Sequence, residues 1–591
     1  MNIKHIVIPK RIKTALFLLF PIYTVLATEL GHLQTPGAMI DFVTNHFGVF
    51  LFDIIIVGGI YFILSALMRK AWISASVCFV MFYTFSCVEF YKYKISGSHF
   101  VITDLALTKN VGDVASFASL SFNLLLLLIA LLYVVYIAFM WLADIEMPFE
   151  KPVRYAASVG VFAVLAVFLV TPYFQVVCGA AGVNSEYTKN TFQENKRFSV
   201  NSLTANLTVN VNQLVNEGPV KPQDYTEEAV DAIIEQASIE KDDPKAQNGA
   251  NVIVVMSESF ADFRTVLEKY PDSGETLPEG TYDAFDKILS ESTEGICVVP
   301  TFGGGTARTE AELIFGLPME TQGNPSIPLS LFEKGKEYRS IPGLFRDNGY
   351  STTYIHPFSA DFYERVDYYG NFGFDKLLFD EDMTVYLSEE LVRLEKEEGI
   401  ETYGYYHNFI SDKSAFDEAL TRIEYTEGPD YIHITTMQNH MPYGEGEEEE
   451  KNYFAGIQNS CEALYEFVTN LKSIEEPVIL LFLGDHFPFF SDAGSIYGRL
   501  GIDELSCDAL YEQKYFIWNN YGAQVPQEPE ISTFYLPCIL SELAGVEDSF
   551  TRAVLSQKEI CPIYSPVIAT EGTEVLKILA YDRINGEGFA E

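Results

Sequence analysis

The chain has 591 residues, more than a single domain of roughly 100–200 residues would need, and 48% of them are hydrophobic although the formal net charge is −42. Residues 1–178 contain 11 Lys and Arg against 9 Asp and Glu, so the remaining 28 basic and 72 acidic residues give the rest of the chain a net charge of −44. This acidity excludes non-specific nucleic-acid binding, which depends on Lys and Arg that neutralise phosphates.

Residues 1–178 are predicted to form a membrane domain, because they hold five long apolar runs. Each run approaches the ~20 residues that a helix needs to cross a bilayer. The runs lie at 15–30, 49–68, 72–90, 120–142 and 155–177. A secretory signal peptide would stop after the first run, whereas this chain continues with four more.

The basic residues of this part predict its orientation. Eight Lys and Arg lie before the first run and in the loops after the second and fourth, against three in the other loops. This asymmetry predicts a cytoplasmic N-terminus, and five crossings then place the residues after about 178 outside the cell. Asp53 and Glu89 lie near the ends of their spans, so we expect them to reach the lipid headgroups rather than to be buried functional carboxylates.

Residues 179–250 are predicted to form a connector that is partly helical. Residues 201–215 place apolar side chains at helical spacing, which fits either a helix lying on the membrane surface or an ordinary packed helix. Residues 236–250 are polar and contain Pro and Gly, so they are predicted to be a loop that leads into a domain of residues 251–591.

The last part of the chain alternates short apolar runs with longer helical patterns. A helix is predicted over 460–473, and strands are predicted over 251–256, 351–355, 431–436 and 478–483. This alternation is typical of an α/β domain with a largely parallel sheet. In such sheets, functional sites form beyond the carboxyl ends of the strands.

Charged, imidazole or phenol side chains follow each of these four strands within a few residues. In strand order they are Glu258; His356, Tyr363 and Arg365; His440; and Asp485 and His486. One such residue alone would be typical of a structural role. Because the whole set meets at one edge of one sheet, we interpret it as a functional site.

Glu258, Asp485 and His486 are predicted to bind a divalent metal. Two carboxylates and one imidazole suit Mn²⁺, Mg²⁺ or Zn²⁺ better than a soft metal. A catalytic metal keeps one coordination position for the reacting group.

The segment 300–318 supplies candidate nucleophiles. Three consecutive glycines, 303–305, allow the backbone to approach a bound group, and a helical pattern follows them. Thr306 and Thr309 would lie at or near the helix N-terminus, where N–H groups favour an anion. Metal coordination activates a threonine hydroxyl, which is weakly nucleophilic alone, and chemistry alone leaves both threonines open.

These ordered motifs resemble the lipoteichoic acid synthase family, in the alkaline phosphatase and sulfatase superfamily, over nearly the whole chain. The family's metal glutamate follows its first strand, as Glu258 does in MSESF, and its Asp-His pair matches Asp485 and His486. Its nucleophilic threonine lies in a Gly-Lys-Thr-Ser-Asp-x-Glu stretch. The stretch here reads Gly-Gly-Thr-Ala-Arg-Thr-Glu, which identifies Thr306 as the nucleophile and as a metal ligand.

The resemblance also implies substrate-binding residues. His440, in NHMPY, matches the family's substrate histidine, and a His-x₆-aromatic-x-Arg spacing matches His356, Tyr363 and Arg365. The family usually has Trp in place of Tyr363 and Lys in place of the glycine before Thr306. The second departure, with Arg308 two residues further on, leaves room for a different acceptor.

The function implied is that of a cell-membrane phosphoglycerol transferase. Its donor would be phosphatidylglycerol or a similar lipid, cleaved by attack of the threonine on phosphorus with release of diacylglycerol. The phosphothreonine intermediate would then pass glycerol phosphate to a glycolipid or polyglycerolphosphate acceptor. One divalent metal is expected, with Mn²⁺ favoured over Mg²⁺ or Zn²⁺, because too few histidines remain for a second ion in this domain.

Three other functions fit parts of the pattern. One is a related transferase that moves phosphoethanolamine, or that moves phosphoglycerol onto a glycan. Another is a membrane-tethered sulfatase or phosphodiesterase, although the segment at Cys297 does not fit the Cys/Ser-x-Pro/Ala-x-Arg stretch that a sulfatase requires. The third is a membrane sensor that binds glycerophosphate without turnover, which would have no need of a nucleophile.

Overall fold

The computed structural model describes residues 6–105, 122–147, 149–188, 191–216, 221–239, 249–322, 328–384, 404–444, 446–492, 494–502, 507–565 and 572–590. The chain forms two compact units. The first covers Met1–Leu105, Leu120–Thr188 and Gln193–Gly218, and the second covers the other segments, chiefly Pro219–Glu591.

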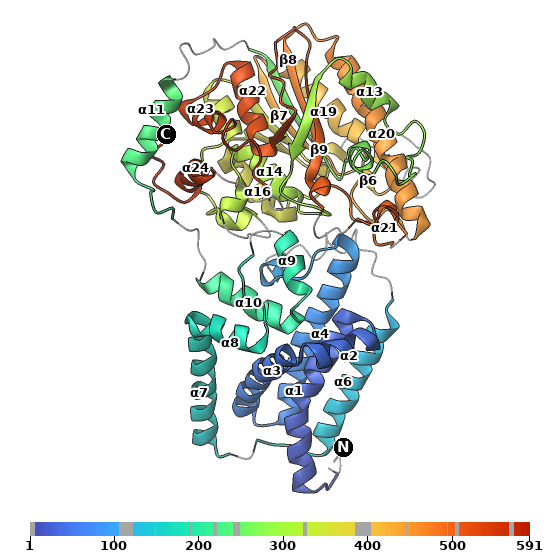
Figure 1. Cartoon of the computed structure of the whole chain (residues 1–591), viewed down its shortest axis with the longest axis vertical. Helices are drawn as coiled ribbons and strands as arrows, with labels where there is room; N and C mark the ends of the chain where they lie inside the picture. The colour runs from blue at the N-terminus through green and yellow to red at the C-terminus, as the bar shows by residue number, and fades with distance from the viewer. Residues whose placement is uncertain are drawn as a thin grey trace. The chain divides into compact units, whose positions relative to one another are not determined.

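Five helices of the first unit are long and apolar enough to cross a membrane, which confirms the five predicted spans (Figure 1). They are α1 (Lys10–Leu33), α3 (Phe47–Met68), α4 (Ala71–Ser96), α6 (Leu124–Leu142) and α7 (Lys151–Val170). The fifth predicted run extends too far, because the helix ends at Val170 and α8 (Tyr173–Ala181) begins after Pro172. A proline interrupts a helix because it lacks the backbone N–H and restricts the residue before it.

Three shorter helices complete this unit: α2 (Pro36–Asn45), α9 (Thr191–Phe198) and α10 (Leu203–Asn216). Most of α10 is buried, including its polar side chains, so it is a packed helix rather than one lying on a surface. Asp53 and Glu89 are also fully buried, which corrects the expectation that they reach the headgroups. Both carboxylates accept hydrogen bonds from other protein groups: Asp53 from Ser202, and Glu89 from the backbone of Phe100.

The second unit is built on an eight-stranded sheet of order β10-β2-β9-β8-β1-β7-β3-β4. The predicted strands are present as β1 (Asn251–Ser257), β3 (Ser351–Ile355), β7 (Asp430–Thr435) and β8 (Val478–Gly484). The sequence did not predict β2 (Thr293–Val298), β4 (Lys376–Leu378), β9 (Glu512–Asn519) and β10 (Glu530–Ser532). Strand β9 is antiparallel to both of its neighbours and all other pairs are parallel, so the sheet is largely parallel as predicted. A separate hairpin joins β5 (Tyr405–Tyr406) and β6 (Phe409–Ile410).

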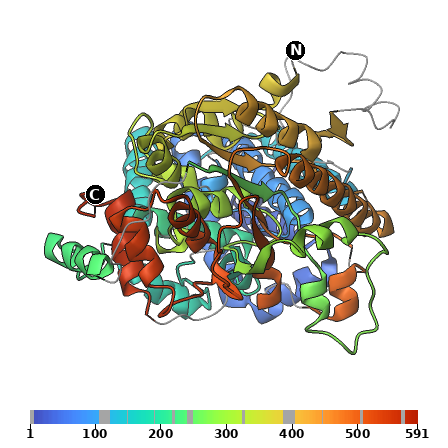
Figure 2. The same cartoon turned by 90° about the horizontal axis from the view of Figure 1, so that it is seen from above.

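Helices cover both faces of the sheet (Figures 1 and 2). One group contains α13 (Asp283–Leu289), α19 (Asp412–Tyr425) and α20 (Glu447–Leu471), which includes most of the predicted helix 460–473. The other contains α14 (Thr306–Phe315), α15 (Ile341–Asp347) and α22 (Leu536–Ala544). The remaining helices are α11 (Glu227–Ile239), α12 (Arg264–Leu267), α16 (Arg365–Tyr368), α17 (Asp380–Thr384), α21 (Ile496–Leu500), α23 (Ser549–Ser556) and α24 (Glu574–Ile584).

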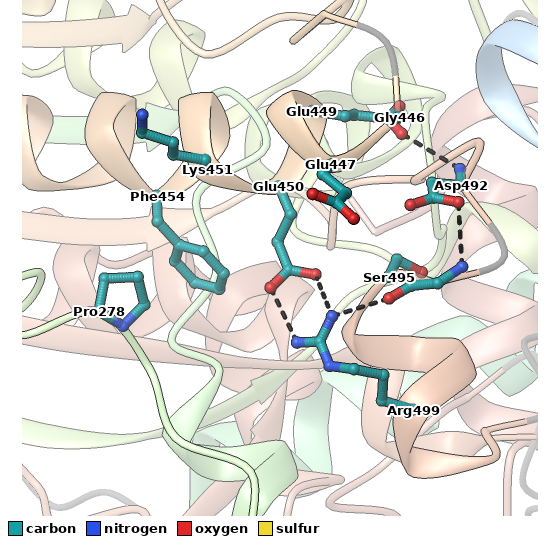
Figure 3. A pocket seen from close by; sticks show the side chains of 11 residues that line it. Pro278, Gly446, Glu447, Glu449, Glu450, Lys451, Phe454, Asp492, Ser495 and Arg499 are labelled. Atoms are coloured by element: carbon teal, nitrogen blue, oxygen red, sulfur yellow. Dashed lines mark hydrogen bonds and ion pairs between the residues drawn. The ribbon is translucent and has the colours of Figure 1, made fainter.

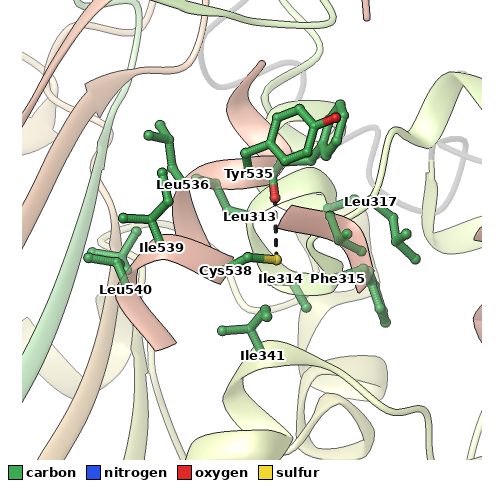
Figure 4. Packing of buried hydrophobic residues seen from close by; sticks show 14 of the residues in the cluster. Leu313, Ile314, Phe315, Leu317, Ile341, Tyr535, Leu536, Cys538, Ile539 and Leu540 are labelled. Carbon is green, nitrogen blue, oxygen red and sulfur yellow. Dashed lines mark hydrogen bonds between the residues drawn. The ribbon is translucent and has the colours of Figure 1, made fainter. Parts of the chain in front are cut away.

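The core of the second unit fixes α14 against the sheet. Alternate residues of β1 and β8, such as Val254 and Leu481, face the same apolar cluster as Leu313 and Phe315 of α14. Figure 4 shows side chains of α14 and α22, with Ile341 of α15, filling this cluster. Burial contributes about 25 cal/mol per Å² of apolar surface, so this packing holds the second half of α14 against the sheet.

Candidate active site

Glu258, Asp485 and His486 come together because β1 and β8 are adjacent and parallel. The two strands pair in register up to Ser257 and Gly484, so the residues that follow them lie at the same edge of the sheet. The three side chains are 3%, 0% and 1% exposed. Their ligand atoms all lie within 4.8 Å of one another, a spacing that could hold a metal ion.

Glycine at 484 is required for this approach of the two strand ends. A Cβ placed there would lie 1.8 Å from the carbonyl oxygen of Phe260, far inside van der Waals contact. The N–H groups of Ser259 and His486 both donate to Asp485 Oδ1, at 2.7 and 2.8 Å. The carboxylate is therefore held in place by the backbone of both strand ends.

The polar atoms of this group fit a divalent cation. His486 donates its Nδ1–H to the carbonyl of Phe487 (2.9 Å), so its Nε2 carries the lone pair, and this atom lies 3.2 Å from Asp485 Oδ2 and 3.8 Å from Glu258 Oε1. Neither His486 Nε2 nor Asp485 Oδ2 has a hydrogen-bond partner within the described part of the chain. Burial, followed by the Glu258 carboxylate, raises the pKa of Asp485 well above its ordinary value. A cation would satisfy all of these groups at once.

Thr306 begins helix α14 beside this group. The glycines before it have φ angles of 69°, 148° and 88°, which lie in the region that disfavours other residues. The Thr306 hydroxyl donates to Glu258 Oε2 at 3.0 Å. Thr309, one turn later and fully buried, instead donates to the backbone carbonyl of Asp485 at 2.8 Å. Of the two candidate nucleophiles, Thr306 therefore has its hydroxyl at a carboxylate of the candidate metal-ligand group formed by Glu258, Asp485 and His486.

His356, Arg365 and Tyr363 form a second group at the end of β3. His356 donates its Nδ1–H to the carbonyl of Thr435 (2.9 Å), and Arg365 Nη1 lies 3.2 Å from His356 Nε2. The guanidinium also lies over the Tyr363 ring, 5.1 Å from its centroid. Burial and then Arg365 lower the pKa of His356 to about 3, so the imidazole is neutral at physiological pH.

His440 belongs to the loop that follows β7. Its Nδ1 donates to the carbonyl of Met441 at 2.7 Å, and the ring is partly exposed. It lies near enough to His356 to interact with it electrostatically. The same loop contacts the metal-ligand group, because Thr436 Oγ1 accepts a hydrogen bond from the N–H of Glu258 at 3.1 Å.

Glu310 of α14 holds Arg365 of the second group in place, and the sequence did not predict this role. Its fully buried carboxylate accepts hydrogen bonds from Tyr354 (2.6 Å), Thr435 (2.5 Å), Tyr369 and Arg365 Nε (3.1 Å). Burial alone would raise the pKa of Glu310, but Arg365 and the nearby imidazoles bring it down to about 2. The sequence feature that could have identified Glu310 is its position four residues after Thr306, which places both residues on one face of α14.

Arg308 lies among acidic residues of the core. It is buried, and its electrostatic partners are Glu320 and Glu312. Because its side chain is buried beside two glutamates, the structure gives no support to a role for Arg308 in acceptor binding.

A pocket at the start of α20 is separate from the predicted residues (Figure 3). Its lining includes Glu447, Glu450, Asp492 and Arg499, and none of the predicted site residues. Arg499 is paired with Glu450 at 2.9 Å and with Glu275 at 2.8 Å. Arg499 is therefore already paired with two glutamates and is not free to bind a phosphate in this pocket.

Comparisons with known proteins agree on the class of the second unit. The model of the family described as Sulfatase matches residues 250–546. A Rhizobium meliloti protein provisionally named for cyclic beta-1,2-glucan modification is 26% identical over 338 residues, which are 52% of this chain and 47% of that protein. Lipoteichoic acid synthase 1 of Bacillus subtilis is 24% identical over 262 residues, which are 40% of this chain and 36% of that protein.

A solved structure, that of the Streptococcus pyogenes phosphoglycerol transferase GacH in complex with sn-glycerol-1-phosphate, also matches. It is 22% identical with a TM-score of 0.47, and the match covers 63% of this chain and 97% of that one. The chain spans less than two thirds of the length of the curated relatives that it matches.

Proposed function

Because the chain belongs to the sulfatase family, through a domain that spans residues 250–546, we propose that it transfers glycerol phosphate from phosphatidylglycerol to an extracellular acceptor. The observation that carries this proposal is the hydrogen bond from Thr306 to Glu258, within a buried group of two carboxylates and an imidazole. Covalent phosphoryl transfer requires an activated nucleophile, and a metal held at this group would activate the threonine hydroxyl.

One divalent metal, for which we propose Mn²⁺, would be held by Glu258, Asp485, His486 and the Thr306 oxygen. When bound, it would supply positive charge that favours the deprotonated threonine and offsets the charge of a phosphate. The N-terminus of α14, which follows three glycines and has no side-chain cap, favours an anion at the same place.

The second group is proposed to bind the glycerophosphate head of the donor. Arg365 carries a positive charge that suits a phosphate oxygen. His356 is neutral, with its Nδ1–H committed to a carbonyl and Arg365 beside its Nε2. His440 is partly exposed and is proposed to contact the phosphoryl group, while Tyr363 lies against Arg365 and limits its movement.

The membrane helices are proposed to keep the enzyme beside its donor, because a lipid with two acyl chains does not leave the bilayer. We propose a cytoplasmic N-terminus, a membrane domain of residues 1–178, a connector of 179–250 and an extracellular catalytic domain of 251–591. The acceptor is proposed to be a glycolipid or a growing polyglycerolphosphate chain.

The decisive experiment incubates the purified full-length protein with phosphatidylglycerol labelled in its acyl chains. We expect release of labelled diacylglycerol with Mn²⁺ and none after chelation. Phosphatidylethanolamine, tested in parallel, distinguishes a phosphoethanolamine transferase, and an aryl sulfate distinguishes a sulfatase. Release from phosphatidylethanolamine alone, or hydrolysis of the sulfate alone, would contradict the proposal.

One alternative acceptor has a specific observation in its favour. The Rhizobium meliloti relative is named for modification of a cyclic glucan, which suggests a soluble or membrane-associated glycan as acceptor. Adding such a glycan to the donor assay tests this alternative. Phosphoglycerol found on the glycan, rather than on a glycolipid, would favour it.

A further inference from the structure

A second group of metal-ligating side chains lies entirely within the first unit, where α1 and α4 end. His32 belongs to the last turn of α1, Glu89 lies two turns before the end of α4, and His99 follows α4. Glu89 Oε1 is 3.1 Å from His32 Nδ1 and 2.6 Å from His99 Nδ1. One ligand atom of each residue lies within 4.8 Å of those of the other two.

The surrounding residues fix this group in position. The other oxygen of Glu89 accepts a hydrogen bond from the N–H of Phe100 at 2.6 Å. The His99 ring is stacked between Phe198 of α9 and Tyr93 of α4, with centroids 3.8 and 4.5 Å away. Such support from hydrogen bonds and packing is what orients histidine and carboxylate ligands at metal sites.

The buried carboxylates near the group have no Lys or Arg partner among the described residues, and the nearby Lys92 ammonium donates instead to the carbonyl of His99 at 2.8 Å. Glu29, Asp53 and Glu89 are each fully buried, and no Lys or Arg forms an ion pair with any of them among the residues described. Glu29 lies near enough to His32 and Glu89 to interact with both electrostatically, and it caps the start of α10 through the N–H groups of Leu203 and Thr204. Asp53 accepts from Ser202 through Oδ1, whereas Oδ2 has no partner in the described structure.

Buried carboxylates in a membrane domain are costly, and they are either paired or ligands of a cation. Two imidazoles and one carboxylate are the donors that first-row transition metals such as Zn²⁺ prefer, and three protein ligands leave a fourth position for water or an anion. The ends of two helices and the loop after α4 would be joined by such an ion.

We propose that His32, Glu89 and His99 form a binding site for a divalent transition metal in the membrane domain, separate from the ligands Glu258, Asp485 and His486. The ion would offset part of the negative charge that Glu29, Asp53 and Glu89 place inside this unit. Zn²⁺ is the probe that we choose, because its preferred ligands and tetrahedral geometry match this donor set.

The experiment measures bound Zn²⁺ on the full-length protein in detergent, after chelation and dialysis against the ion. A triple variant, Glu258→Ala with Asp485→Ala and His486→Ala, removes the candidate catalytic ligands, so its result does not depend on the proposed enzymatic activity. We expect this variant to retain about one Zn²⁺ per chain. Adding His32→Ala and His99→Ala should remove that ion, whereas adding His46→Ala, a histidine of the same domain outside the group, should not.

A more conservative variant and a second measurement test the proposal even if the alanine variants fail to fold. Glu89→Gln keeps the size and a hydrogen-bond acceptor but loses the charge, and in the triple-variant background we expect its affinity for Zn²⁺ to fall at least about 10-fold, as with lost metal-site interactions. Co²⁺ in place of Zn²⁺ should give the visible absorption of a low-symmetry nitrogen and oxygen site. The proposal is overturned if the triple variant binds no Zn²⁺, or if Zn²⁺ and the Co²⁺ spectrum are unchanged by the His32 and His99 substitutions. Either result would mean that His32, Glu89 and His99 form a hydrogen-bonded group that does not bind a metal.

Discussion

Thr306 and Thr309 lie one turn apart on α14, yet their hydroxyls have different partners. Thr306 donates to a carboxylate of the metal-ligand group, and Thr309 donates to a backbone carbonyl. Thr306→Ala should lower turnover by roughly 10⁴- to 10⁶-fold, the range seen when a covalent nucleophile is removed. Thr309→Ala removes only a buried hydrogen bond and should retain part of the activity. Mass spectrometry after incubation with phosphatidylglycerol should find the glycerophosphoryl group on Thr306; its presence on Thr309 would contradict the assignment.

Glu310 is paired with Arg365, so we expect it to act through Arg365 rather than on the substrate. Glu310→Gln removes the charge that holds the guanidinium, so Arg365 should lose its fixed position beside His356. We expect kcat/KM to fall about 10²-fold, mainly through a higher KM, because misplacement of a binding group by about 1 Å has effects of this size.

Glu312→Gln is the matched control for Glu310→Gln. Glu312 is a buried glutamate of the same helix, but its electrostatic partners are Arg308 and Glu320. It should change thermal stability without changing KM for the donor. An equal rise in KM for both variants would mean that the effect of Glu310 is a general loss of structure.

At the scale of elements, β7 carries a buried histidine whose charge opposes folding at low pH. His433 is fully buried without a hydrogen-bond partner in the described residues, and burial lowers its pKa to about 4, against 6.5 in the unfolded chain. The unfolded state therefore binds more protons, so stability is complete above pH 6.5 and is lost as the pH falls towards 4.

This linkage predicts that the pH dependence of the thermal unfolding midpoint of the full-length protein is caused in part by His433. Between pH 6.5 and 5, the loss attributable to one such histidine is on the order of 2 kcal/mol. His433→Gln should flatten the change in unfolding midpoint over this interval, whereas His407→Gln, at an exposed position, should not. An unchanged slope for His433→Gln would contradict the prediction.

The elements also show what could be predicted from the sequence. Strands β1, β3, β7 and β8 are short runs dominated by apolar or β-branched residues, and the polar groups after them were predictable because parallel strands end at one edge. Strand β9 mixes charged with apolar residues and runs antiparallel, so the alternation of strands and helices did not reveal it. The hydrogen-bond donors to Glu310 of α14 come from β3, β7, α16 and the turn at Tyr369, which only the folded sheet brings together.

At the scale of the whole molecule, composition divides the chain into two chemically different parts. The N-terminal part is nearly neutral and contains five helices suited to a membrane, whereas the rest carries almost the entire negative charge. Asp and Glu contribute little to orientation in a membrane, so the distribution of Lys and Arg around the spans is the relevant signal. Eight basic residues against three favour a cytoplasmic N-terminus.

The orientation predicts which part of the chain an external protease can reach. A protease added to intact cells should digest the region after about residue 180 and leave the five spans as a protected fragment, because five crossings place the two ends on opposite sides of the membrane. Antibodies against tags at each terminus would follow the two fragments, and inverted membrane vesicles provide the control, in which the N-terminal tag should be lost and the acidic domain protected. Protection of the acidic domain in intact cells would reverse the orientation. It would also remove access to donor lipids of the outer leaflet, so the topology experiment tests a condition that the proposed reaction requires.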